Sequence, residues 1–302
     1  KAEKADFRIA TILLDQTPFY AESGGQASDT GRIVNESAKA TVLSVTKYQD
    51  LYLHRVKIEE GTFAEGDRVL ATVDRLRRNS AARNHTATHL LHQALKDVLG
   101  HHVEQAGSSV TAEGLRFDFT HFEAMSAEQL TTVESLVNDK ISEFHPVQVR
   151  ELPIEEAMKT GAAAQFGEKY GAIVRVVSVG SYSNEFCGGT HVENAGQVGA
   201  FAIRSEIGVA AGVRRIEAIT GPMVTAQLHK SEKILSQGAE LLKTQPDNLL
   251  GRICALLEEN KAARKSLEDT KEQALENSVG GLLSEAKEIK GVRLVTAAYD
   301  GY

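Results

Sequence analysis

The sequence predicts an α+β protein with a small N-terminal β-barrel, a central α+β domain with a mostly antiparallel sheet, and a C-terminal helical hairpin. Three observations lead to this prediction. Short apolar runs alternate with turn residues up to about residue 73. At Asp74 the apolar spacing changes from two to about 3.6 residues. From Pro222 onward helix-forming residues dominate and strand-forming residues are few.

The composition is that of a globular protein. The chain has 302 residues, 42% hydrophobic and 25% charged, with a formal net charge of −7. This length favours two or three domains. The negative charge argues against non-specific coating of nucleic acid, but it is compatible with a local basic groove. Two cysteines cannot form a disulfide framework, so we expect reduced thiols and a cytoplasmic location. We expect no membrane partner, because no apolar run approaches the ~18 residues of a membrane span and no signal-peptide pattern is present.

Residues 1–73 are predicted to form the β-barrel domain. The runs "RIATILL", "ATVLSVTKY" and "LYLHRVKI" are separated by Gly, Asp and Asn, and "EEGTFAEGDRVLATVD" is typical of a turn followed by a strand. A small barrel is the simplest closure for this many short strands.

Residues 74–221 are predicted to form the α+β domain. In "DRLRRNSAARNHTATHLLHQALKDVLG", Asp74 is the N-cap candidate and Gly100 marks the C-terminus, with a break expected near Asn79–Ser80. "LRFDFTHF" alternates like a half-buried strand, and "SAEQLTTVESLVNDKISEFHP" opens with Ser126 and Gln129 in capping-box spacing. Later strands are predicted in "AIVRVVSVG", "GAFAIRSE" and "VRRIEAIT".

Residues 222–290 are predicted to form a helical, coiled-coil-like segment. Its weak heptad pattern suggests a hairpin with a hinge near Gly280–Gly281. Residues 291–302 resemble the opening strand of a truncated C-terminal domain. Because the first residue is Lys1, we expect both ends to belong to a larger protein.

Two short motifs, far apart in the sequence, carry residues that bind transition metals. "HTATH" places His85 and His89 four positions apart on the predicted helix, so both imidazoles can meet one ion. "CGGTH" places Cys187 four positions before His191, and its two glycines are expected to supply φ freedom for the turn. Alone, each motif has an ordinary explanation, a solvated histidine pair or a small buried cysteine. Together they form an N/S set of four ligands, the kind that zinc binds tetrahedrally.

Two alternatives concern the same helix. His92 follows His85 by seven positions on nearly the same face and could replace one ligand, but we interpret it as a polar residue at the rim. A metalloprotease of the HExxH type is excluded, because that chemistry needs a glutamate where this sequence has Thr86.

Read in full, "NHTATHLLHQAL" and "CGGTHVENAGQVGAF" resemble the editing domain of the alanyl-tRNA synthetase family. The related domain of threonyl-tRNA synthetase shares the HxxxH arrangement, but "TPFYAESGGQASDTG" at 17–31 and "GVAAGVRRIEAITG" at 208–221 favour the alanyl family. The resemblance covers essentially the whole chain. It implies a fragment that lacks the aminoacylation and tRNA-recognition half and most of the C-terminal domain, and we therefore expect no aminoacylation by this chain.

The resemblance also implies site residues. The implied zinc ligands are His85, His89, Cys187 and His191, with one Zn²⁺ per chain. The implied catalytic residues are Thr88, which senses the misattached side chain, Gln105 in "HVEQAGS" and Arg214 in "GVRR". The implied substrate-binding residues are Glu22, Ser23, Gly24, Gly25 and Gln26 of "ESGGQ".

Basic residues are expected to contact the acceptor end of tRNA(Ala). Arg83 leads directly into His85, and Arg215 lies on a later predicted strand, so we assign both to substrate binding. The wider basic set is Arg75, Arg77, Arg78, Arg204 and Arg214. The alternative for any one of them is a solvated surface charge.

The resemblance implies hydrolysis of the ester in mischarged Ser-tRNA(Ala) and Gly-tRNA(Ala), while the full-length enzyme ligates alanine to tRNA(Ala) using ATP. A pocket for the methyl group of alanine also admits glycine, and serine adds only a hydroxyl. Such differences give only ~1–3 kcal/mol, so a second, hydrolytic site is required. There Thr88 would recognise the serine hydroxyl, unless its own hydroxyl bonds the helix backbone. Zinc would either activate water after exchanging a ligand or orient the substrate, and we favour orientation.

Three alternatives remain open. The chain could be a non-catalytic tRNA-binding module with structural zinc, a freestanding editing homologue, or an oligomerisation fragment. A homodimer is expected to form through the helical segment and the missing C-terminal region.

Overall fold

A computed structural model of the chain describes residues 8–163, 170–284 and 286–296, without the side chains of residues 279 and 282–284. Residues 1–7 of the predicted barrel domain and 297–302 of the predicted C-terminal start therefore lie outside the described residues. The chain divides into two compact units, residues 1–227 and 228–302. The sheets are mostly antiparallel and are combined with helices, as predicted. No helix in the described ranges is long and apolar enough to cross a membrane.

An antiparallel sheet of five strands opens the first unit, in the order β1-β4-β3-β2-β5. Its strands are β1 (Arg8–Leu13), β2 (Gly31–Val34), β3 (Lys39–Tyr48), β4 (Leu51–Glu60) and β5 (Leu70–Val73). Ile33, Val42 and Val56 form the centre of its core. The predicted barrel is not closed in the described residues, because β1 and β5 are the two edges of the sheet. Periodicity identifies strands, but it carries no information on whether the first strand pairs with the last.

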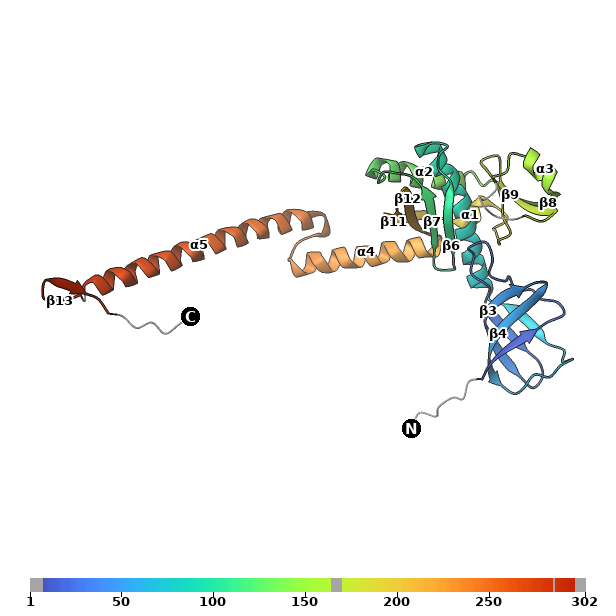
Figure 1. The fold of residues 1–302 in the computed structure, drawn as a ribbon, viewed down its shortest axis with the longest axis horizontal. Coiled ribbons are helices and arrows are strands. Elements are labelled where there is room, and N and C mark those ends of the chain that lie inside the picture. Colours follow the sequence, from blue (N-terminus) through green and yellow to red (C-terminus); the bar gives the residue numbers. More distant parts are fainter. Residues whose placement is uncertain (1–7, 164–169, 285, 297–302) are drawn as a thin grey trace. The chain divides into compact units, whose positions relative to one another are not determined.

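Helix α1 (Arg75–Leu99) begins directly after β5 (Figure 1). The Asp74 side chain accepts hydrogen bonds from the backbone N–H groups of Leu76 and Arg77, which confirms it as the N-cap. The break expected near Asn79–Ser80 is wrong: the helix is continuous. Packing of the helix outweighs the modest helix propensity of these two residues.

The central sheet has the order β11-β12-β7-β6, and α1 and α2 contribute to its core. Its elements are β6 (Gln105–Val110), β7 (Leu115–Thr120), α2 (Ala127–Ser142), β11 (Phe201–Ala210) and β12 (Val213–Thr220). Phe117 and Phe119 of β7 are fully buried in the same core cluster as Leu91 of α1. The capping box of Ser126 and Gln129 is present as predicted.

A second sheet, in the order β10-β9-β8, was not separated from the first by the sequence prediction. Its elements are β8 (Val147–Pro153), α3 (Ile154–Lys159), β9 (Ile173–Val179) and β10 (Ser183–Phe186). It has its own small core around Val176 and Phe186. The loop that follows β10 carries the CGGTH motif and leads to a short 3₁₀ helix, η1 (Ala195–Val198).

The C-terminal helices do not form the predicted packed hairpin. The elements here are α4 (Pro222–Leu241), the 3₁₀ helix η2 (Pro246–Asn248), α5 (Leu249–Ser284), β13 (Lys287–Ile289) and β14 (Val292–Leu294). None of the described side chains of α5 is buried, and Leu257 and Leu267 of the expected seam are exposed. Helix α5 also continues through the expected hinge at Gly280–Gly281. The heptad pattern is too weak to bury a seam.

Candidate metal centre and adjoining cavities

Four side chains converge on one point. His85 and His89 project from α1, while Cys187 and His191 come from the loop after β10. One ligand atom from each residue lies within 4.8 Å of those of the other three. Cys187 Sγ is 3.3 Å from His85 Nε2 and 3.2 Å from His191 Nε2. Two ligands of a tetrahedral zinc ion would be ~3.6 Å apart for these bond lengths, so the group could hold one ion.

The outward-facing nitrogen of each histidine has a polar neighbour. His85 Nδ1 lies 2.6 Å from Gln26 Oε1, and His191 Nδ1 lies 3.1 Å from Thr86 Oγ1. His89 Nδ1 is 3.6 Å from a carboxylate oxygen of Glu185, and it is buried without a hydrogen bond. Metal-binding histidines typically direct the second ring nitrogen to such partners, which fix the ring and its tautomer.

His92 does not belong to the converging group. Its Nδ1 lies 3.0 Å from Glu185 Oε1, and its ring lies against Phe117, with centroids 5.2 Å apart. The prediction that His92 lies at the rim is wrong, because its side chain is buried. Glu185 joins His92 to His89 through one carboxylate.

The two glycines of CGGTH work differently from the prediction. Neither residue is among those with positive φ, so the expected left-handed freedom is not used. A Cβ on Gly189 would instead lie 2.0 Å from His85 Cε1, whereas a Cβ on Gly188 would meet nothing within 4 Å. Gly189 is needed because the His85 ring occupies the space of a side chain.

Arg175 of β9 holds the backbone of the CGGTH loop through hydrogen bonds. Its Nη1 donates to the carbonyl oxygens of Cys187 at 2.8 Å and Gly189 at 2.6 Å. Hydrogen bonds to a charged donor are stronger than neutral ones, so these two contacts hold the loop backbone in place.

The local electrostatics favour the metal-binding protonation states of Cys187 and His191. Burial opposes the charge on Cys187, but the neighbouring His85 and His89 bring the pKa of its thiol well below the usual value. Burial, together with the charge of His85, lowers the pKa of His191 to about 3. A thiolate and a neutral imidazole are the forms that bind metal. At His89, burial acts against the charged form, but Glu185 and Cys187 raise its pKa to about 9.

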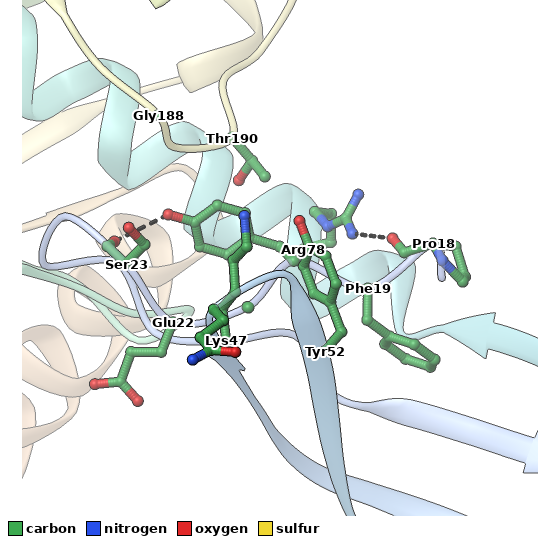
Figure 2. Close-up of a pocket in the computed structure, with 12 residues that line it drawn as sticks. Pro18, Phe19, Glu22, Ser23, Lys47, Tyr52, Arg78, Gly188 and Thr190 are labelled. Atoms are coloured by element: carbon green, nitrogen blue, oxygen red, sulfur yellow. Dashed lines mark hydrogen bonds between the residues drawn. The ribbon is translucent and has the colours of Figure 1, made fainter. Parts of the chain in front are cut away.

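Two cavities in the described part of the chain adjoin the ligand loop. The larger, of about 660 Å³, lies between the N-terminal sheet and the loop (Figure 2). It is lined by Pro18, Phe19, Tyr20, Ala21, Glu22, Ser23, Lys47, Gln49, Tyr52, Arg78, Gly188 and Thr190. The smaller, of about 480 Å³, is lined by His191 and Arg83, among other residues.

The ESGGQ segment is divided between cavity and cluster. Glu22 and Ser23 line the larger cavity. Gly24 and Gly25 form a turn with positive φ, and a Cβ on Gly25 would lie 2.6 Å from the carbonyl oxygen of Ser108. Gln26 is buried against the metal cluster, where its amide bonds both His85 and Thr190.

The other predicted residues lie further along α1, β6 and β12. Thr88 is buried, and its hydroxyl donates to the Asn84 carbonyl oxygen at 2.8 Å, the backbone interaction that we considered as its alternative. Gln105 Nε2 lies 3.3 Å from Ser108 Oγ. Arg214 forms a two-pronged ion pair with Glu206, and Arg215 forms one with Asp118. None of the four lines either cavity described above.

Sequence reasoning missed three residues of the cluster: Thr86, Glu185 and Arg175. Thr86 lies inside HTATH, and Glu185 precedes Cys187 by two positions, so their proximity to ligands was a usable signal. Arg175 precedes Cys187 by 12 positions, and no sequence pattern connects it with the ligands.

Comparisons with known proteins match the N-terminal region and the region of the CGGTH motif. Residues 1–77 match the family model of class II tRNA synthetases (A), and residues 174–217 match the threonyl and alanyl tRNA synthetase second additional domain. An alanine–tRNA ligase of Acetivibrio thermocellus is 51% identical over 100% of this chain and 34% of the relative. Alanine–tRNA ligases of Alkaliphilus oremlandii and Clostridioides difficile are 49% and 50% identical over 95% and 99% of this chain, and over 33% and 34% of the relatives. The chain thus spans about one third of the length of these curated relatives.

Proposed function

We propose, from the premise that this chain belongs to the alanine–tRNA ligase family, that its four-residue cluster binds zinc and supports hydrolysis of tRNA wrongly charged with serine or glycine. The observation that carries this proposal is the convergence of His85, His89, Cys187 and His191 beside two cavities. Ligation of alanine to tRNA(Ala) with ATP is proposed for the whole enzyme, of which this chain would be the editing part. The proposed division of the chain is an N-terminal sheet domain, an editing domain at 74–221, a helical segment at 222–290 and a further C-terminal domain.

The residues fit zinc on three counts. Three imidazole nitrogens and one thiolate are a donor set that zinc takes in proteins. The buried Nδ1 of His89 has a carboxylate next to it but no hydrogen bond, which is consistent with a ring held from its other side. The space next to Gly189 accommodates the His85 ring where any side chain would clash.

The residues of this chain would orient both the ligands and the substrate. Gln26 and Thr86 would hold the rings of His85 and His191 through hydrogen bonds to their outer nitrogens, and the Glu185 carboxylate lies 3.6 Å from the outer nitrogen of His89. Bound zinc would supply a positive charge that orients and polarises the ester or a water molecule. A backbone held by Arg175 would keep Cys187 and Gly189 in place while the substrate enters.

The roles implied for Thr88, Gln105 and Arg214 remain proposals. The Thr88 hydroxyl donates a hydrogen bond to the Asn84 backbone carbonyl oxygen. Its oxygen therefore keeps lone pairs that could accept a hydrogen bond from the hydroxyl of a seryl group. Arg214 is paired with Glu206, so contact with RNA would require this pair to open. For Arg83 we propose phosphate binding, because it lines the cavity that His191 also lines.

The proposal is tested by incubating the chain with Ser-tRNA(Ala), Gly-tRNA(Ala) and Ala-tRNA(Ala) and measuring ester hydrolysis. We expect hydrolysis of the first two in excess of the third, loss after chelation, and recovery with Zn²⁺. Equal, slow hydrolysis of all three with and without chelator would contradict editing and favour a tRNA-binding module with structural zinc.

A second candidate role is self-association through the helical segment. Leu228, Ile234 and Leu235 of α4 and Leu257 and Leu267 of α5 are exposed. Exposed apolar side chains in such number are typical of a surface that is covered in an assembly. Sedimentation with and without residues 222–302 tests this role, and an unchanged monomeric mass would contradict it.

A further inference from the structure

The larger cavity shares its wall with the metal cluster. Gly188 and Thr190 line it, and each is the direct sequence neighbour of a candidate ligand, Cys187 or His191. Its opposite wall comes from the N-terminal sheet, with Lys47 from β3 and Tyr52 from β4 (Figure 2). A volume of about 660 Å³ is within the range of cavities that bind a small molecule or one unit of a polymer.

Three aromatic rings line this cavity, those of Phe19, Tyr20 and Tyr52, and the Phe19 ring is buried in the core of the N-terminal sheet. Tyr52 is partly buried and packs against the core of the N-terminal sheet. Tyr20 donates its hydroxyl to the Ser23 carbonyl oxygen at 2.9 Å, and burial raises the pKa of its phenol, so it stays neutral. Rings fixed in this way offer flat apolar faces beside polar groups.

The cavity also contains available positive charge. Lys47 Nζ lies 5.6 Å from the centroid of the Tyr52 ring, and its carboxylate neighbour Asp50 is 3.8 Å away and fully exposed. Surface pairs of this kind contribute little, so the ammonium group can bind another anion. Glu22 is the one acidic residue among those that line the cavity.

The wall is preformed rather than assembled on binding. Arg78 of α1 donates to both oxygens of Asp29 at 2.8 Å and to the carbonyl oxygen of Pro18. Asp29 also accepts from the backbone N–H of Tyr20 at 2.6 Å. The loop that presents Tyr20 is therefore tied to the first turns of the metal-bearing helix.

From these contacts we infer that the cavity is a subsite for one unpaired nucleotide at the 3′ end of an RNA, with its base against Tyr52 and its phosphate near Lys47. Aromatic faces beside a cation are the combination that binds single-stranded nucleic acid, because every base has a π face and every nucleotide a phosphate. The inference rests on the proposed function: an ester held at the cluster would place the terminal ribose next to this loop. The N-terminal sheet then takes part directly in substrate binding.

The test uses an uncharged RNA hairpin with three unpaired 3′ nucleotides, the last of them 2-aminopurine. The chain contains no tryptophan, so fluorescence of the probe is observed without that background. We expect saturable quenching with the wild-type chain. Lys47→Ala and Tyr52→Leu, which keeps an apolar side chain but removes the aromatic ring, should each weaken binding about 10-fold, within the range for loss of one stacked base or one phosphate contact. Lys47→Ala should also reduce the slope of log affinity against log salt concentration by about 1.

Matched controls are available on the same strands. Tyr48 is exposed at the end of β3 outside the cavity, and Lys39 pairs with Glu60 at its opposite end. Tyr48→Ala and Lys39→Ala should leave the affinity within twofold of wild type. Thermal unfolding of each variant checks that the fold is retained.

Several results would overturn the subsite. These are equal binding by wild type, Lys47→Ala and Tyr52→Leu, equal binding of a blunt hairpin, or equally tight binding of free AMP. The failure of the subsite and that of the proposed function remain distinguishable, because RNA binding is measured without ester hydrolysis. Hydrolysis with unchanged KM in both variants would leave editing intact and remove the subsite. Probe binding that depends on both residues, without any ester hydrolysis, would support the subsite and contradict the proposed editing function.

Discussion

Gln26 Oε1 lies 2.6 Å from His85 Nδ1, although the two residues come from different parts of the chain. Gln26 lies in the connection between β1 and β2 of the N-terminal sheet, whereas His85 belongs to helix α1 of the central domain. The same amide oxygen accepts from the backbone N–H of Thr190 at 2.9 Å, and its nitrogen donates to the Thr190 hydroxyl at 2.8 Å. One buried side chain therefore orients a metal ligand and the loop that carries two others.

Replacing Gln26 should weaken metal binding without removing a ligand. Gln26→Ala leaves His85 Nδ1 and the Thr190 N–H without their acceptor, and we expect zinc affinity to fall about 10- to 100-fold. Competition with a chromophoric chelator measures the affinity. The exposed Gln148→Ala is the control and should bind zinc like the wild type. Unchanged affinity in Gln26→Ala would show that the ring is held without this bond.

The two glycines of the ligand loop should differ sharply. Gly189→Ala places a methyl group 2.0 Å from His85 Cε1, so either the ring or the loop must move. We expect at least a 10-fold loss of zinc affinity and a destabilisation of about 1–3 kcal/mol. Gly188→Ala has open space and should be close to neutral. Zinc titration and urea unfolding of the pair give the comparison, and similar behaviour of the two variants would contradict the packing argument.

Loss of the thiol should remove metal and hydrolysis together. Cys187→Ala deletes one of the four donors, and we expect zinc affinity to fall by more than about 100-fold, beyond the effect of losing an outer partner. Zinc content after dialysis is measured beside the rate of Ser-tRNA(Ala) hydrolysis. Cys254→Ala, at the exposed second cysteine, is the control for both measurements. A variant at 187 with full zinc content and no activity would exclude the thiol as a ligand.

The N-terminal sheet should lose stability in acid through His54. This buried ring has Nδ1 at 3.0 Å from the Ile12 carbonyl oxygen, which requires a proton there, so Nε2 accepts from the Thr17 hydroxyl at 2.7 Å. Burial lowers the pKa of His54 below its usual 6.5 despite these backbone bonds. Between the lowered pKa and 6.5 the unfolded chain binds more protons than the folded one. The free energy of unfolding contributed by this group is therefore complete above pH 6.5 and falls as the pH decreases, by at most about 1.4 kcal/mol per pH unit.

Urea unfolding at pH 7.5 and pH 5.0 measures this contribution. His54→Phe should reduce the difference between the two pH values, and a variant at the exposed His229 of α4 should preserve it. An identical pH dependence in wild type and His54→Phe would show that another group is responsible.

The metal ligands could be predicted from the sequence because their spacing is local. A helix fixes the relation of His85 to His89, and a five-residue loop restricts Cys187 and His191. The orientation of Thr88 could not be predicted in the same way. The neighbouring His89 faces the cluster, while Thr88 lies above Asn84, whose amide bonds Thr220 of β12. The hydroxyl of Thr88 bonds the backbone carbonyl one helical turn earlier, which is one of the two alternatives that the sequence left open.

Pairing between distant residues limits the other predictions as well. Arg214 and Arg215 appear as available cations in the sequence, but Glu206 and Asp118 neutralise them in the folded chain. In the same way, strands were correctly identified in residues 8–73, while the edges of their sheet follow from which strands meet. Composition and periodicity report local preferences. The pairing of the two arginines and the edges of the sheet are decided by tertiary contacts.

The ion pair of Asp29 and Arg78 constrains how this protein can vary. Removal of the carboxylate leaves a partly buried guanidinium without its partner, and removal of the guanidinium leaves an almost fully buried anion. Each single substitution is therefore far more destabilising than replacement of both residues by apolar ones. Related sequences should therefore either keep both residues or lose both. A library that randomises the two codons jointly would recover folded combinations that stepwise substitution never reaches.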